Sequence, residues 1–175
     1  LGLLLVFRAG IWNIGAEGQL YVGAIGALVA GYFVPSIPGP LQIILMVIFA
    51  FIFGGVWGAI PGYLRARFNT NEIIVSLLMV FVAEKFVSYL IKFPWRSTTA
   101  AGFPVSETIW PTAWLPILPG TGAHAGIIIA LGLSVVVWFI LQKSTFGYRV
   151  KAVGVNPDTA LYGGIPLRKV IVTSF

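Results

Sequence analysis

Residues 41–60 read LQIILMVIFAFIFGGVWGAI, a run of 20 residues in which no side chain is charged. A helix needs about 20 predominantly apolar residues to cross the hydrocarbon core of a bilayer. Three other apolar stretches are of similar length, at 19–34, 72–93 and 126–141. The sequence therefore predicts four complete membrane spans and an all-α fold, a polytopic transmembrane helical bundle.

Both ends of the chain carry shorter apolar stretches. Residues 1–7 are too few to cross a bilayer, and they lack the basic leader and small-residue cleavage site of a signal peptide. Residues 170–175 begin another apolar run and stop. We therefore expect a transmembrane permease domain over 1–175 that is truncated at both ends, with two partial spans beside the four complete ones.

The composition favours a lipid environment. Of 175 residues, 58% are hydrophobic and 9% are charged, which is too little polar surface for a soluble globule of this size. The absence of cysteine excludes disulfides and thiolate metal clusters. The net charge of +6 does not predict nucleic-acid binding, because the basic residues lie between apolar runs rather than on one soluble face.

The connectors between the predicted spans fall into two sets on opposite sides of the bilayer. The set at 8–18, 61–71 and 142–169 is rich in cations, and the positive-inside rule places it in the cytoplasm. The other set includes the proline- and tryptophan-rich connector 94–125, which we expect to fold as an external cap. The basic residues of the cytoplasmic set are Arg8, Arg65, Arg67, Lys143, Arg149, Lys151, Arg168 and Lys169.

Small residues recur every four positions in two of the predicted spans. They are Gly23, Ala27 and Gly31 in the first span and Gly54 and Gly58 in the second. Small residues at this spacing let helix backbones approach closely in lipid. We expect these positions to pack the helices into a compact bundle.

The sequence contains no recognisable catalytic set. His124 is the single histidine, and metalloprotease, nucleophile-elbow and phosphate-binding-loop motifs are absent. We therefore predict no enzyme activity, no metal site and no cofactor on this chain. If ATP drives transport, the hydrolysing site must lie on a different polypeptide or another domain.

Glu84 and Lys85 occupy the middle of the third predicted span. Charges at this depth must be paired, hydrated or turned toward a cavity. Glu84 is one candidate for a solute path or an ion relay. The alternative is a partly interfacial helix in which the pair neutralises itself, since adjacent helical residues point about 100° apart and cannot both face one narrow pore.

The segment WNIGAEGQ at 12–19 is polar and precedes a predicted span. Irregular backbone at membrane depth is tolerated where it lines a cavity, so Asn13, Glu17 and Gln19 are further candidates for the translocation path. A plain cytoplasmic turn with Glu17 near a helix N-terminus is the alternative.

The largest cytoplasmic loop, 142–169, contains the stretch NPDTALYGG at 156–164. Asn156 is a good helix N-cap, a proline suits the first helical position, and Asp158 suits the positive helix start. The two glycines at the end can close the helix in a left-handed turn. The pattern predicts a helix of about two turns, either gripped by another protein or resting on lipid headgroups.

Three motifs carry a family resemblance over nearly the whole chain. They are NIGAEGQ at 13–19, LRAR at 64–67 with NEII at 71–74, and GYRVKAVGVNP at 147–157 followed by Ala160 and GGI at 163–165. Together they resemble the permease subunits of bacterial ABC importers for branched-chain amino acids, simple sugars and nucleosides. The first and third motifs look closest to the nucleoside and simple-sugar branch.

The resemblance implies an all-helical, multi-pass permease in the bacterial inner membrane. Its partners would be a second permease, identical or homologous, two ABC ATPase subunits that bind ATP and Mg, and an extracytoplasmic solute-binding lipoprotein. The loop helix would dock into a groove on the ATPase. The coupling residues on this chain would be Gly154, Asn156, Asp158, Ala160 and Gly164.

The function expected from the resemblance is ATP-driven import of a small polar solute, nucleosides first and simple sugars next. A proton-coupled secondary transporter, using Glu84 or Glu17, is the alternative. A structural membrane protein is the third interpretation, and it predicts no solute flux.

Overall fold

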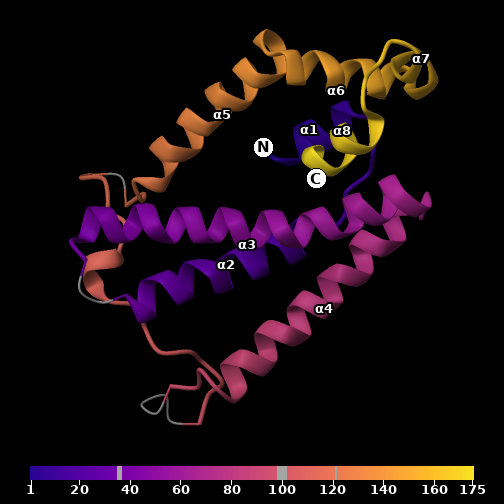
Figure 1. The fold of residues 1–175 in the computed structure, drawn as a ribbon. Coiled ribbons are helices and arrows are strands. Elements are labelled where there is room, and N and C mark those ends of the chain that lie inside the picture. The colour runs from indigo at the N-terminus through magenta and orange to yellow at the C-terminus, as the bar shows by residue number, and fades with distance from the viewer. Residues whose placement is uncertain (35–36, 98–101, 121) are drawn as a thin grey trace. The chain divides into compact units, whose positions relative to one another are not determined.

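The computed structural model describes residues 1–34, 37–97, 102–120 and 122–175. Helices dominate these ranges, and no strand forms within them beyond two isolated bridges. The predicted all-α class is confirmed. The elements in chain order (Figure 1) are α1 (Leu3–Arg8), α2 (Ala16–Phe33), α3 (Gly39–Phe68), α4 (Glu72–Lys92), the 3₁₀ turn η1 (Pro111–Ala113), α5 (Gly126–Lys143), α6 (Thr145–Val155), α7 (Pro157–Tyr162) and α8 (Leu167–Ser174).

Helix α3 is longer than the predicted span 41–60. It continues through Pro61 to Phe68, so the predicted connector 61–71 is wrong over most of its length. Pro61 removes one backbone donor, but membrane helices tolerate proline where neighbouring groups satisfy the freed carbonyl. The helix ends with basic residues in its last turn, which suit its negative C-terminus, and Asn69 then adopts a positive φ of 54°.

The predicted loop 142–169 is also largely helical. Helix α6 follows α5 after a single residue, Ser144, whose Oγ accepts a hydrogen bond from the Gly147 N–H at 3.0 Å. The sequence did not predict α6, because its glycines and charges resemble those of a loop. Val150 and Val153 are nevertheless buried, since they form the inner face of α6.

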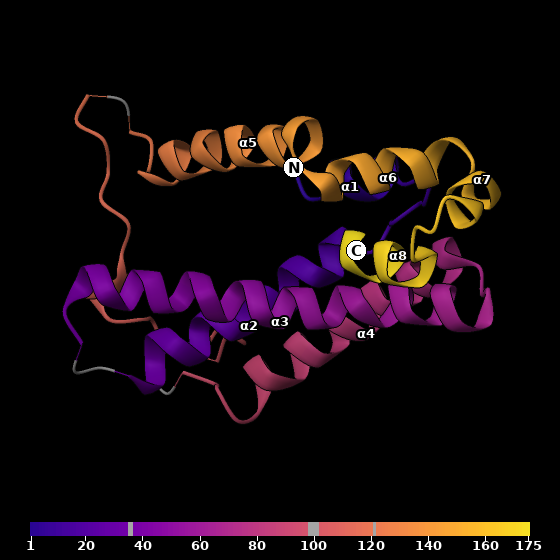
Figure 2. The ribbon, with the colours of Figure 1, turned by 45° about the horizontal axis from the view of Figure 1, so that its top comes forward.

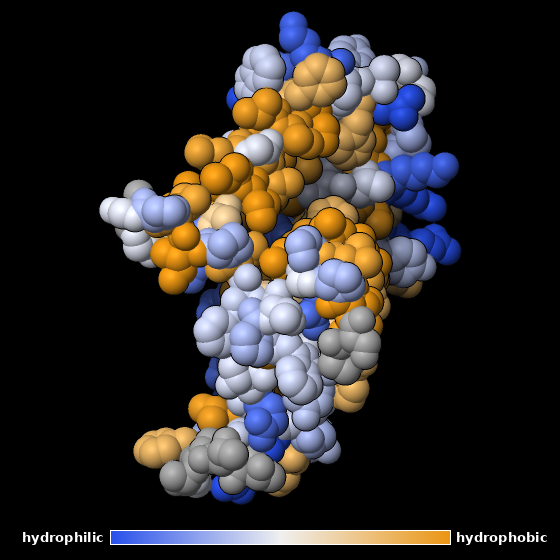
Figure 3. Space-filling view, turned by 90° about the vertical axis from the view of Figure 1, so that its left-hand side faces the viewer, coloured by the Kyte–Doolittle hydropathy of each residue, from blue (hydrophilic) through white to orange (hydrophobic). Residues whose placement is uncertain are grey.

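Within the described ranges, three helices are long and apolar enough to cross a bilayer: α3, α4 and α5. Helix α2 covers nearly the same residues as the first predicted span, but it is not among these three helices. Its first turn contains the polar residues Glu17 and Gln19. Its crossing of the membrane stays a prediction. Large hydrophobic side chains are exposed on the long helices, such as Phe51 at 83%, and Figure 3 shows broad hydrophobic patches on one face.

The chain divides into two compact units. The first unit comprises Leu1–Ala16, Gly58–Ser76 and Leu115–Phe175, and it contains the three sequence motifs apart from residues 17–19. The second unit comprises Glu17–Trp57 and Leu77–Trp114.

The core of the first unit is built around α6. Helix α6 contacts α1, α5, α7 and α8, whose arrangement around it can be followed in Figure 2. Val150 is 0% exposed and Val153 is 2% exposed. The buried cluster they join contains Val6, Ala9, Ile11, Leu141, Ala160 and Val170.

In the second unit, α2 packs on α3 through glycine. A Cβ atom added at Gly23 would lie 3.1 Å from the Ala50 carbonyl oxygen, and one added at Gly54 would lie 3.1 Å from the Gln19 carbonyl oxygen. The contact is tighter still at Gly26, which the four-residue pattern missed. A Cβ atom added there would lie 2.6 Å from the Phe49 carbonyl oxygen. Of the other predicted packing residues, Gly31 and Gly58 are buried and Ala27 is partly buried.

A single buried amide joins the other ends of these two helices. Gln42 is 0% exposed, and its Nε2 donates to the carbonyl oxygens of Gly31 at 3.1 Å and Val34 at 3.3 Å. Its Oε1 accepts from the Thr112 hydroxyl at 3.1 Å. Because a buried amide without partners is costly, these bonds hold the α2–α3 hairpin and the η1 turn together.

Replacing Gly54 with valine should destabilise the full-length protein by about 1–3 kcal/mol, because the new side chain overpacks the α2–α3 contact. The measurement is the thermal unfolding midpoint of purified protein in detergent. Gly55→Val is the matched control, since no atom lies within 4 Å of a Cβ at Gly55. Equal midpoints for the two variants would contradict the packing described here.

Candidate functional site

The NIGAEGQ motif begins with a tight turn. Asn13 is 3% exposed, and its Oδ1 accepts from the Gly15 N–H at 2.7 Å. The Ile14 N–H donates to the Ser76 hydroxyl at 3.2 Å. A Cβ at Gly15 would lie 3.0 Å from both Asn13 and Ser76, so a larger residue there would crowd both side chains. The Asn13 oxygen is therefore used to close this turn.

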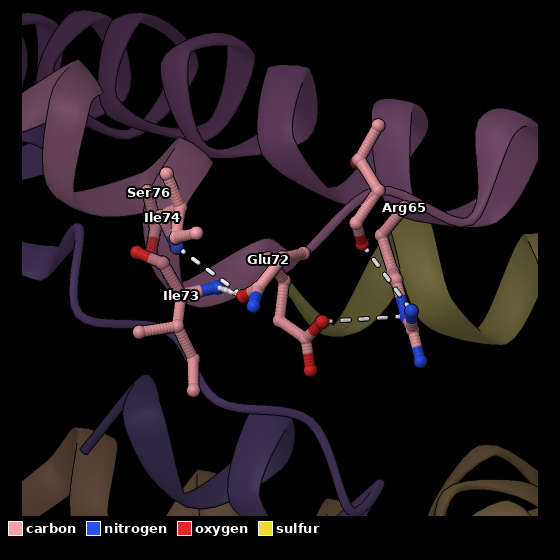
Figure 4. A network of polar contacts seen from close by, with 7 residues as sticks. Arg65, Glu72, Ile73, Ile74 and Ser76 are labelled. Atoms are coloured by element: carbon pink, nitrogen blue, oxygen red, sulfur yellow. Dashed lines mark hydrogen bonds and ion pairs between the residues drawn. The ribbon is translucent and has the colours of Figure 1, made fainter.

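The second motif forms the turn between α3 and α4 (Figure 4). Arg65 lies with its Nε 3.4 Å from a Glu72 carboxylate oxygen, and its Nη1 donates to the Thr70 carbonyl at 3.2 Å. The Asn71 side chain accepts from the Ile73 N–H at 3.0 Å and so caps α4. Arg65 thus joins the end of α3 to the connecting segment and to the first residue of α4.

The first two motifs, far apart in sequence, meet in the first unit. Ser76 is 0% exposed and follows the α4 cap, and its hydroxyl donates to the Ile73 carbonyl at 3.2 Å while accepting from Ile14. The α3–α4 turn therefore fixes the path of the chain as it enters α2.

The third motif contains the predicted short helix, which is confirmed as α7 (Pro157–Tyr162). The Asn156 Oδ1 accepts from the Thr159 N–H at 3.0 Å, and Asp158 lies in the first turn. Gly164 has a φ of +77°, and its N–H donates to the Leu161 carbonyl at 3.0 Å. Asn156 and Asp158 thus stabilise the start of α7, and Gly164 turns the chain after its end. All three residues are exposed.

Two of the predicted coupling residues contact other helices of the first unit, and of these Ala160 is buried whereas Gly154 is exposed. Ala160 is 5% exposed and belongs to the buried cluster of the first unit. A Cβ at Gly154 would collide with the Arg8 carbonyl group, and one at Gly10, whose φ is +72°, would lie 3.3 Å from the Gly154 Cα. Ala160 therefore packs α7 into the buried cluster, and the absence of a side chain at Gly154 lets α6 approach α1 closely.

The exposed face of α6 and α7 carries residues that sequence reasoning missed. Tyr162 is 93% exposed, Val155 is 87% exposed and Leu161 is 57% exposed. Large exposed apolar patches mark interaction sites, so these exposed side chains are candidates for one. The signal available in the sequence was the aromatic Tyr162 directly before the two glycines that end α7.

The remaining predicted path residues lie in the second unit. Glu17 is exposed and accepts a hydrogen bond from the Tyr21 hydroxyl at 2.8 Å. Tyr21 and Glu84 both line a pocket of about 240 Å³. Glu84 also pairs with Lys85, with 3.2 Å between the Lys85 Nζ and a Glu84 oxygen, as the neutralising alternative predicts. Gln19 is partly exposed, and Asn13 belongs to the first unit.

These features define a helical integral membrane protein in which short helices and tight turns, rich in basic residues, pack around a buried cluster. Residues 1–175 match the family described as branched-chain amino acid transport system, permease component. The chain belongs to this permease family, which confirms the resemblance carried by the three motifs.

Curated relatives narrow the comparison. The chain is 36% identical to a guanosine ABC transporter permease protein of Bacillus subtilis, over 99% of this chain and 50% of the relative. It is 35% identical to a glucose ABC transporter permease protein of Haloferax volcanii, over 100% of this chain and 48% of the relative. It is 30% identical to a nucleoside ABC transporter permease protein of Lactococcus lactis, over 99% of this chain and 50% of the relative.

The chain spans about half the length of the curated relatives it matches. No solved structure matches it significantly.

Replacing Gly154 with alanine should lower the thermal unfolding midpoint of the full-length protein by several degrees, because the Cβ forces α6 away from the Arg8 carbonyl. Gly163→Ala is the control, since its nearest neighbours would lie at an ordinary 3.5 Å. If Gly154→Ala unfolded at the wild-type temperature, the α1–α6 contact would not be as close as described.

Proposed function

We propose that the chain forms part of the permease subunit of an ATP-driven ABC importer that moves a small polar solute. Nucleosides are the first candidate and simple sugars the next. The observation that carries this proposal is the identity of 36% and 30% to permeases named for guanosine and nucleosides, beside 35% to one named for glucose.

The proposed importer needs partners that supply energy and solute. ATP and Mg would be bound by two ABC ATPase subunits, since the sequence of this chain has no phosphate-binding loop. A second permease, identical or homologous, would complete the path, and a solute-binding lipoprotein would deliver the solute from outside. The basic loops support a multi-pass orientation in a bacterial inner membrane with these loops in the cytoplasm.

In this proposal, α7 receives the ATPase through its exposed side chains, with Tyr162 at the centre. The buried side of α7 is joined to the core by Ala160, and α6 is locked to α1 at Gly154. A displacement of α7 is therefore expected to move α6 with it rather than deform the loop.

The corner between α6 and α5 suits the transmission of that displacement. The Ser144 hydroxyl donates to the Ile140 carbonyl at 2.6 Å and accepts from the Gly147 N–H. A Cβ at Gly147 would collide with the carbonyl oxygens of Ile140 and Leu141. This tight corner supports a rigid link from the proposed docking helix to the apolar helix α5.

Labelled guanosine should enter cells that express the full-length protein with its neighbouring transporter subunits. Excess unlabelled adenosine should compete and excess ribose should not, and uptake should persist when the proton gradient is dissipated while ATP is maintained. Entry of labelled ribose or glucose without guanosine would move the assignment to the sugar branch. Loss of uptake with the proton gradient would favour a secondary transporter.

Replacing Tyr162 with serine should reduce uptake by about fivefold or more, as the loss of roughly 1 kcal/mol of interface energy would. Membrane insertion and expression should be unchanged, because Tyr162 is 93% exposed and packs little on its own chain. Tyr148→Ser is the control, since Tyr148 is 69% exposed on α6. Uptake at the same level in both variants would remove Tyr162 from the proposed contact.

A further inference from the structure

A pocket of about 830 Å³ lies in the first unit, between the end of α1, the last turn of α3 and the α7–α8 segment. Much of its wall is aliphatic. The side chains that give it this character are Leu161, Leu167 and Ile171, together with Ile11 and Val153, which are themselves largely buried. Such a wall favours an apolar occupant over a free polar solute.

The same pocket is lined by four cations, Arg65, Arg67, Arg168 and Lys169. Arg65 is bound to Glu72. The other three have no acidic partner within 4 Å among the residues that the structure describes, and all three are exposed.

Nearby acids do not cancel this charge. Of the five acidic residues in the chain, Glu72 and Asp158 are the two that belong to the first unit. Neither lines the pocket, and Glu72 is already neutralised by Arg65. The pocket therefore presents a net positive charge next to an aliphatic surface.

The position of the cations along their helices indicates their depth. Arg67 lies in the last turn of α3, a helix long and apolar enough to cross a bilayer. Basic residues at the ends of such helices lie at the level of the lipid headgroups. Arg168 and Lys169 belong to α8 and line the same pocket, so they meet Arg67 near that level.

We propose that this pocket binds an anionic phospholipid of the cytoplasmic leaflet. The phosphate is held by Arg67, Arg168 and Lys169, since guanidinium and ammonium groups donate several strong hydrogen bonds to phosphate. The upper part of the acyl chains lies on the aliphatic wall. Basic pockets between helices on the cytoplasmic side suit such headgroups.

Occupancy has a consequence for the short helix α7. Pro157 and Leu161 of α7 form one side of the pocket, and Arg67 and Asn69 at the end of α3 form another. A bound phospholipid bridges these segments within the first unit. The lipid therefore stabilises α7 in the position described here.

The test uses the full-length protein purified in detergent, with thermal unfolding followed as phosphatidylglycerol is added. Phosphatidylglycerol should raise the unfolding midpoint, and phosphatidylcholine or inorganic phosphate should not. In Arg168→Gln/Lys169→Gln, the phosphatidylglycerol concentration for half of the effect should rise about tenfold or more, since each cation near an anionic headgroup contributes about fivefold.

The matched control is Lys143→Gln/Arg149→Gln, which removes two exposed cations of the first unit that do not line the pocket. It should respond to phosphatidylglycerol as the wild type does. A second readout, independent of unfolding, is the phospholipid phosphorus that co-purifies with the protein, which should fall in the pocket variant alone.

Three results would overturn the proposal. An unchanged phosphatidylglycerol response in the pocket variant would show that these cations do not hold the lipid. An equal response to inorganic phosphate would indicate a small-anion site. Weaker binding of the ATPase partner without any change in the lipid response would make this pocket a protein contact instead.

Discussion

A backbone inside a bilayer has no water to bond, and the rest of this structure depends on that constraint. It explains why the long apolar stretches become the continuous helices α3, α4 and α5, and why α3 continues through Pro61. Because lipid is as apolar as a protein core, helices in a bilayer gain little from burying apolar side chains against each other. Close packing of their backbones stabilises the contact instead. The Gly23 and Gly54 contact and the fully bonded Gln42 are the result in the second unit.

The first unit follows different physics, because it has a conventional buried core around α6. Glycine again permits the closest contacts, at Gly154 against α1 and at Gly147 in the α5–α6 corner. This packing turns what reads as a long loop into a rigid assembly of short helices. Its inward residues hold α7 in place, and its outward residues, above all Tyr162, are exposed.

Membership of the permease family, the similarity to guanosine, nucleoside and glucose permeases, and the polar assembly on the basic side agree with one another. The three motifs have distinct physical roles in that assembly. The first closes its own turn through Asn13, the second braces the α3–α4 turn through Arg65 and Glu72, and the third forms the exposed helix α7. The proposed lipid pocket lies between the second and third motifs, so the composition of the bilayer would act on the same helix as the proposed ATPase partner.

The sequence by itself determined the all-α class, the long apolar helices and the capped helix α7, because apolar length and capping chemistry are local properties. It also contained the three motifs that carry the family resemblance. Only the tertiary structure decided which side chains of α6 and α7 face inward, since Ala160 is buried and Tyr162 exposed through contacts of α7 with α6 and α8 that no local pattern encodes. The length of α3, the existence of α6 and the meeting of Arg67 with Arg168 likewise depend on packing between segments distant in sequence.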